Sequence, residues 1–157
     1  MEKQMIKNYR MKLYALFMLL ALAGCSTLIG PHSPTAYENA TSLKAEVLVT
    51  LGKANTPYSD NEAEIEAIKL KAEQAYEYVK GVPKNQLSTK QWEILKDPDG
   101  DLLGNFLKRW KERSTLSDTI IEEYKKLASD AFDEIICLEA NKKEPTECMT
   151  DGDSNNG

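Results

Sequence analysis

The sequence of 157 residues is poor in the side chains that transition-metal sites and histidine-based catalytic centres need, because it contains one histidine and three cysteines. Its longest apolar run is about 11 residues, well short of the ~20 that a membrane-spanning helix requires. Apolar residues make up 41% and charged residues 29%, as in ordinary soluble proteins. The composition therefore excludes a disordered polyelectrolyte, a collagen-like fibre and a polytopic membrane protein, and the length allows one domain behind a short leader.

Residues 1–24 differ in composition from the rest of the chain. The segment begins with a basic stretch whose cations are Lys3, Lys7, Arg10 and Lys12. The apolar run Leu13–Ala23 follows. At ~1.5 Å per residue this run is too short to cross a ~30 Å hydrocarbon core, but it has the length of the apolar region of a signal peptide.

The run ends in Leu22-Ala23-Gly24-Cys25, which resembles the lipobox of bacterial lipoproteins. The resemblance covers residues 1–26 and implies that the Cys25 sulfur receives a diacylglycerol (palmitate-type acylation) and that cleavage makes Cys25 the first mature residue. In the enterobacterial sorting scheme of that class, Ser26 in place of aspartate implies the outer membrane, on its periplasmic side, rather than the inner membrane. The alternative is an ordinary secretory signal with an incidental cysteine.

The mature chain is expected to be strongly acidic. Four of the 20 basic and one of the 25 acidic residues lie in the leader, so 16 and 24 remain, a formal charge of −8. This balance argues against nucleic-acid binding, which depends on phosphate neutralisation. We expect attachment to the membrane through acyl chains on Cys25, and a protein partner in the envelope. Residues 25–34, with one glycine and two prolines, are predicted to form a flexible tether in which His32 is solvated.

Residues 35–143 are predicted to form one all-α domain, because apolar residues recur there at spacings of three and four. Short connections favour a small antiparallel bundle of about five helices, three long and two short. The expected start signals are Thr35 with Glu38, Ser59 with Glu62, Ser88 with Gln91, Asp101, and Ser117. The last helix is expected to end near Lys142, and residues 144–157 to form a polar, partly disordered tail.

Two groups of side chains raise the questions of a disulfide and of metal binding. Cys137 and Cys148 favour a structural disulfide in an oxidising periplasm, with a redox or metal-binding thiol pair as the alternative.

The acids Asp97, Asp99 and Asp101 superficially resemble a calcium loop. The EF-hand pattern fails, because it needs glycine at the sixth position and glutamate at the twelfth. A turn is favoured there, and weak calcium binding stays open.

A basic aromatic patch is formed by Lys108, Arg109, Trp110, Lys111 and Arg113. Such a patch could receive an acidic partner, a lipid headgroup or a cell-wall carboxylate. The favoured alternative is a solvated helix end with Trp110 in the core, because Trp110 follows Phe106 by four residues. Trp92 is likewise expected in the core.

We find no recognisable nucleophile motif and no glycine-rich phosphate loop, and we therefore predict no catalytic residue, cofactor or metal. The sequence thus favours an envelope lipoprotein whose acidic helical domain acts by protein binding, as an adaptor or an inhibitor. The alternatives are a cell-wall-active enzyme with helix-borne carboxylates near Trp92 or Trp110, and a carrier of a small ligand in a cavity between helices.

Overall fold

The computed structural model describes residues 30–142, and every regular element in this part of the chain is helical. The helices are α2 (Pro34–Leu51), α3 (Glu62–Gly81), α4 (Gln86–Lys96), α5 (Leu103–Arg113) and α6 (Asp118–Asn141). A short 3₁₀ helix, Tyr58–Asp60, precedes α3. The predicted small all-α bundle is therefore confirmed.

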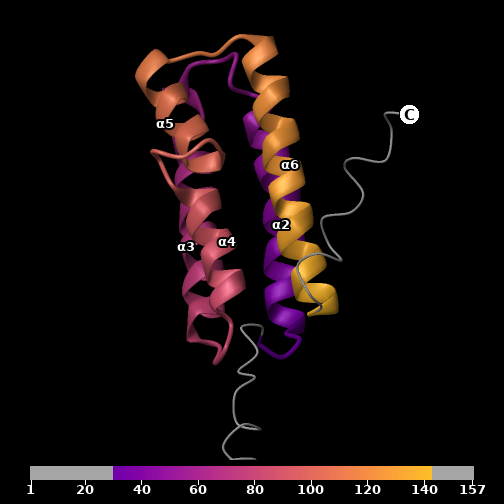
Figure 1. Cartoon of the computed structure of the whole chain (residues 1–157). Helices are drawn as coiled ribbons and strands as arrows, with labels where there is room; N and C mark the ends of the chain where they lie inside the picture. The colour runs from indigo at the N-terminus through magenta and orange to yellow at the C-terminus, as the bar shows by residue number, and fades with distance from the viewer. Residues whose placement is uncertain (1–29, 143–157) are drawn as a thin grey trace, which may run out of the picture.

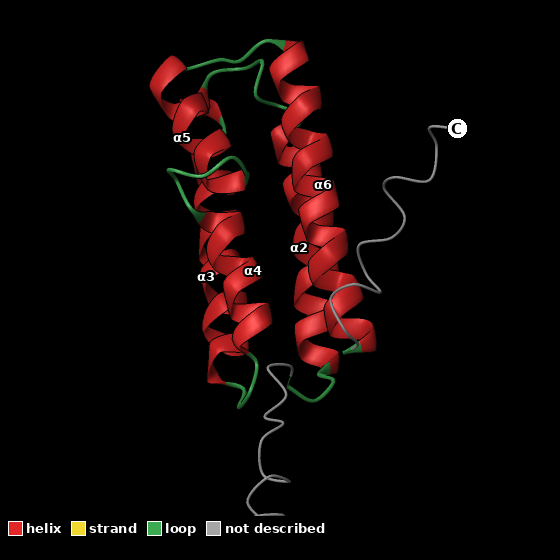
Figure 2. Cartoon of the chain, viewed as in Figure 1, coloured by secondary structure: helices red, strands yellow, loops and turns green. Residues whose placement is uncertain are grey.

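The helices pack as an antiparallel bundle of four rods, which we call limbs (Figure 1). α2, α3 and α6 each form one limb, and α4 and α5 in succession form the other, the third along the chain. α2 contacts α3 and α6, and α4 contacts the same two helices. α5 continues the direction of α4 after a turn, so the two short helices together make the third limb. The first and last helices lie side by side, which places residues 30 and 142 at the same end of the bundle (Figure 2).

Both tryptophans lie in the core, as expected. Trp92 packs edge-on against Phe132 with ring centroids 6.0 Å apart, and Trp110 packs against Phe106 at 6.1 Å. All four side chains have no exposed surface. The indole of Trp110 also donates a hydrogen bond to the carbonyl of Thr56 at 3.0 Å, which satisfies its polar atom inside the core.

The predicted helix starts were wrong at the N-terminal ends of α2, α3 and α4. α2 begins before Thr35, at Pro34, because proline suits the first helical position and the hydroxyl of Ser33 accepts the Ala36 N–H at 3.2 Å. Ser59 lies in the 3₁₀ helix, and α3 starts after Asn61. Ser88 is buried inside α4, which starts after Asn85.

The start of α5 was also misplaced, whereas that of α6 was correct. α5 begins at Leu103 with Leu102 before it, so Asp101 is not the capping residue. Ser117 directly precedes α6, although its side chain makes no capping bond. Local capping signals therefore located the helices only to within a few residues.

Gly104 allows the two helices of the third limb to approach closely. A Cβ atom at this position would lie 2.2 Å from the carbonyl oxygen of Lys96 and 2.5 Å from the carbonyl carbon of Asp97. Both obstacles are backbone atoms, which cannot rotate away as a side chain would. The absence of a side chain at Gly104 is therefore what lets α5 pack onto the end of α4.

We predict that Gly104→Ala lowers the free energy of unfolding by about 1–3 kcal/mol, because the added methyl group forces the backbones of α4 and α5 apart. The matched control is Gly81→Ala, where the added Cβ meets nothing within 4 Å and stability should be unchanged or slightly higher. Urea unfolding followed by circular dichroism measures both. Equal midpoints for the two variants would contradict this account of Gly104.

Candidate functional site

An open groove of about 820 Å³ runs along the face formed by α3, α4 and α5. This volume is within the ~300–1,000 Å³ typical of ligand sites. Its uncharged lining residues are Ala72, Ile94, Pro98, Leu103, Gly104 and Leu107. Ile94 remains 49% exposed, so the groove presents a large apolar side chain to solvent. The two short helices, the turn between them and α3 thus shape a concave surface of the described domain.

Charged side chains of both signs surround this apolar floor. They are Lys69, Glu73, Lys90, Glu93, Lys96, Asp97, Lys108, Lys111 and Glu112. Five lysines thus face four acids, whereas the mature chain is expected to carry 16 basic and 24 acidic residues. The groove is therefore slightly positive within an acidic protein.

Four of the five groove lysines are held in exposed ion pairs. Lys96 reaches Glu73 at 2.6 Å, and its ammonium also lies 3.7 Å from the centre of the Tyr76 ring. Lys108 reaches Asp99 at 2.7 Å, and this hydrogen bond raises the pKa of Lys108 above the ordinary lysine value. Exposed pairs contribute only ~0–1 kcal/mol each to stability. The groove can therefore exchange them for the charges of a partner at little cost.

The predicted basic aromatic patch does not exist as one surface. Trp110 is fully buried, and Arg109 is turned toward α6, where its guanidinium donates to the Tyr124 hydroxyl at 2.9 Å. Lys108 and Lys111 line the groove, while Arg113 is exposed at the end of α5. The favoured sequence interpretation of Trp110 as a core residue is confirmed, and two of the five patch residues join the groove.

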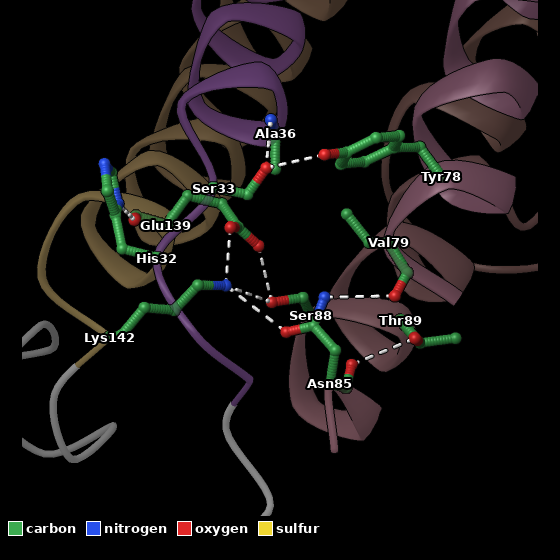
Figure 3. Close-up of polar contacts among 10 residues, drawn as sticks. All are labelled: His32, Ser33, Ala36, Tyr78, Val79, Asn85, Ser88, Thr89, Glu139 and Lys142. Atoms are coloured by element: carbon green, nitrogen blue, oxygen red, sulfur yellow. Dashed lines mark hydrogen bonds and ion pairs between the residues drawn. The ribbon is translucent and has the colours of Figure 1, made fainter. Parts of the chain in front are cut away.

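A polar cluster lies at the end of the bundle that holds His32, Glu139 and Lys142 (Figure 3). Glu139 has no exposed surface, yet its carboxylate accepts a hydrogen bond from Ser88 at 2.6 Å and pairs with Lys142 at 2.5 Å. The Lys142 ammonium also donates to the Asn85 side chain at 3.2 Å. We call Glu139, Lys142, Ser88 and Asn85 the polar clamp. It joins the end of α6 to the start of α4.

The same end of the bundle holds residues 30–33, which the sequence assigned to the tether 25–34, and residues 25–29 lie outside the described part of the chain. His32 is exposed to solvent, as expected, but its Nδ1 also donates to the carbonyl of Glu139 at 2.6 Å. The Ser33 hydroxyl is hydrogen-bonded to the Tyr78 hydroxyl at 2.8 Å. Gly30 is buried. The prolines and glycine suggested a tether because composition does not reveal that this segment docks on the folded domain.

The polar clamp contains the residue types of a serine–lysine catalytic centre, but its position argues for a structural role. Ser88 is 1% exposed and Glu139 is 0% exposed. Neither residue lines the groove. A nucleophile must reach its substrate, so these side chains serve to join helices.

The enzyme alternative requires accessible carboxylates near a tryptophan, and the carrier alternative requires a cavity between helices. The enzyme interpretation used carboxylates near Trp92 or Trp110, and both indoles are buried. Of the groove acids, Glu73 and Glu93 are paired with lysines. The carrier interpretation required a cavity between helices, whereas the groove is open to solvent. Neither alternative gains a supporting contact, and both stay predictions.

The remaining predicted sites lie partly outside the described residues. Cys25, Ser26 and Cys148 belong to segments that the structure does not describe. Cys137 is half-buried on α6. Because Cys148 lies outside the described residues, the pairing of the two cysteines stays a prediction.

The acidic segment after α4 forms the turn that the sequence favoured. The Asp97 carboxylate accepts the Asp99 N–H at 2.9 Å, and Gly100 N–H bonds back to the Asp97 carbonyl at 3.3 Å. Asp101 is exposed. Among residues 30–142, no three side chains of metal-binding type lie close enough together to hold an ion.

Comparisons with protein-family models, with curated protein sequences and with solved structures find no match to this chain. Over the described part of the chain, no helix combines the length and the apolar character needed to cross a membrane.

Sequence reasoning missed the polar clamp, although the helical register contains a signal for it. Glu139 follows Phe132 by seven residues and Ile135 by four, which puts it on the apolar face of α6. Ser88 precedes Trp92 by four on the buried face of α4. A charged residue in an apolar register must be paired when buried, and this rule would have pointed to Lys142, three residues on.

We predict that Glu139→Ala destabilises the protein by about 3–5 kcal/mol, because it leaves the buried Lys142 ammonium without its carboxylate. Glu134→Ala removes an exposed acid from the same helix and should change stability little. Urea unfolding measures both variants. The double variant Glu139→Leu with Lys142→Met should lose less than the sum of its single variants, and strict additivity would show that the two side chains are not coupled.

Proposed function

We propose that this protein is an outer-membrane lipoprotein of the bacterial envelope that acts by binding another envelope protein, as an adaptor or an inhibitor. The groove on α3, α4 and α5 would take an acidic, partly apolar segment of that partner. The observation that carries the proposal is the combination of an apolar floor with a charged, lysine-rich rim.

The composition of the groove fits protein recognition. Interfaces usually combine an apolar centre with a polar rim, and Ile94, Leu103 and Leu107 supply such a centre here. The groove is open to solvent and lined by three helices, so a segment of another protein can reach it. The groove has one more lysine than acids and therefore favours an acidic segment of a partner. The acidic remainder of the protein would repel the same segment.

The anchor supports the same function. A lipidated Cys25 would hold the end of the bundle at which Gly30 contacts the α3–α4 loop, while the groove lies along α3, α4 and α5. We also propose that Cys137 and Cys148 form a disulfide in the periplasm. The half-buried position of Cys137 is compatible with this pairing, and a loop of that length would contribute ~3 kcal/mol.

We predict that the protein incorporates labelled palmitate in bacterial cells and fractionates with the outer membrane, because acyl burial of ~0.8 kcal/mol per CH₂ makes release of a multiply acylated chain negligible. Cys25→Ser should abolish both the label and the processing. Ser26→Asp should move the processed protein to the inner membrane. An unlabelled wild-type protein would contradict the anchor.

We predict that a photoreactive phenylalanine analogue at Ile94 crosslinks one protein of defined mass in living cells, because this side chain lies at the groove and is 49% exposed. The control is the same analogue at Val49 on α2, which is 65% exposed and lies outside the groove. The adduct should form from Ile94 alone. Identical adducts at both positions, or an uncrosslinked monomer at both, would overturn the groove as the binding site.

The charge of the partner is tested in the same assay. Lys96→Glu with Lys108→Glu should reduce the Ile94 adduct several-fold, because two rim lysines that attract an acidic segment become repulsive. Lys125→Glu with Lys126→Glu makes the same charge change on α6 and should leave the adduct unchanged. A loss of equal size in both double variants would show that total charge, and not the groove, governs binding.

A further inference from the structure

The loop between α3 and α4 lies against the first described residue of the chain. Gly30 is buried there, and a Cβ added to it would lie 3.1 Å from the carbonyl oxygen of Pro83. His32 and Ser33 are hydrogen-bonded to the same end of the bundle. The chain that leads back to Cys25 therefore leaves the domain directly beside residues 82–85.

The chain between Cys25 and Gly30 is short. Five residues span at most ~3.3–3.6 Å each, or about 18 Å when fully extended. If Cys25 carries the lipid, the α3–α4 loop must lie within this distance of the membrane surface. α3 has 20 residues and is about 30 Å long, so the opposite end of the bundle can stand much farther from the membrane.

The hollow at this end carries more basic than acidic side chains, whereas the whole chain carries more acidic ones. A shallow hollow of about 440 Å³ there is lined by Lys80, Lys84 and Lys90, with Glu93 as its single acid. Pro83 and Lys84 are exposed, and the hydrogen bond to Glu77 raises the pKa of Lys80 above its ordinary value. The three lysines therefore lie next to Pro83, an apolar residue at the tip of the loop.

We propose that residues 80–84 rest on the phospholipid headgroups of the membrane that holds the anchor, with Lys80 and Lys84 contacting anionic phosphates. The acyl chains hold the protein, and the loop fixes its orientation. Anionic lipid attracts this end and repels the acidic remainder, so the bundle stands away from the surface with the groove free. The inference rests on the proposed lipidation of Cys25.

The test uses the full lipidated protein in phosphatidylcholine vesicles, with and without phosphatidylglycerol, prepared from lipids brominated near the head of the acyl chain. A tryptophan is introduced by Pro83→Trp at the loop, or by Thr115→Trp in the exposed connection at the opposite end. The native Trp92 and Trp110 are fully buried and give a constant background. Bromine should quench the added fluorescence of Pro83→Trp several-fold more than that of Thr115→Trp.

The charge is tested by Lys80→Glu with Lys84→Glu in the Pro83→Trp protein, which should remove the extra quenching that phosphatidylglycerol produces. Lys125→Glu with Lys126→Glu makes the same charge change on α6, outside the hollow and the groove, and should have no effect. Equal quenching of both introduced tryptophans overturns the orientation. Quenching that does not depend on phosphatidylglycerol overturns the role of the lysines.

Two further measurements separate failure of this inference from other failures. The mass of the Cys25 peptide and the flotation of the protein with vesicles report lipidation independently of quenching, so a lipidated, floating protein without loop quenching overturns the inference alone. If Pro83→Trp loses helicity, Gln86→Trp places the probe in the first turn of α4, at the same end of the bundle. The same quenching result is then expected from that position.

Discussion

The buried charge of Glu139 is the constraint on which one whole end of the structure depends. A carboxylate without exposed surface must find donors, and here they are the Ser88 hydroxyl from α4 and the Lys142 ammonium. Lys142 reaches it from a left-handed backbone, φ 45°, a conformation that glycine usually supplies at a helix end. The ion pair therefore explains why a lysine occupies this position, and the hydrogen bonds of Glu139 to Ser88 and of Lys142 to Asn85 tie the end of α6 to the start of α4.

The fold was predictable because large apolar side chains repeat at helical spacing. Trp92, Phe106 and Trp110 fell on the faces that the sequence indicated, and all three are buried. Helix starts were less predictable, because capping pairs such as Ser88 with Gln91 are only local signals. Ser88 suits a capping position, but its hydroxyl is needed by a carboxylate 51 residues away. Tertiary contact overrode local preference at that position.

The groove could not be predicted, because it belongs to no single segment. It requires α5 to pack onto the end of α4, and this approach depends on the missing side chain of Gly104 beside the carbonyl of Lys96. The sequence placed Lys108 and Lys111 in one basic patch with Arg109, since the residues are adjacent. Helical geometry instead turns Arg109 toward Tyr124 and leaves the two lysines in the groove. Adjacent residues on a helix do not share a face.

The polar clamp also lies beside the described segment that leads back toward Cys25. His32 bonds to the backbone of Glu139, whose side chain is part of the clamp, and Gly30 packs against the loop that contains Asn85. The segment 30–33 therefore stays on the domain only while α6 and α4 keep their register. If Cys25 carries the lipid, five residues lead from it to Gly30 and nine lead to the start of α2, which correspond to reaches of about 18 and about 32 Å. The contacts that hold residues 30–33 on the domain would then keep the bundle that carries the groove within the shorter of these distances from the proposed anchor.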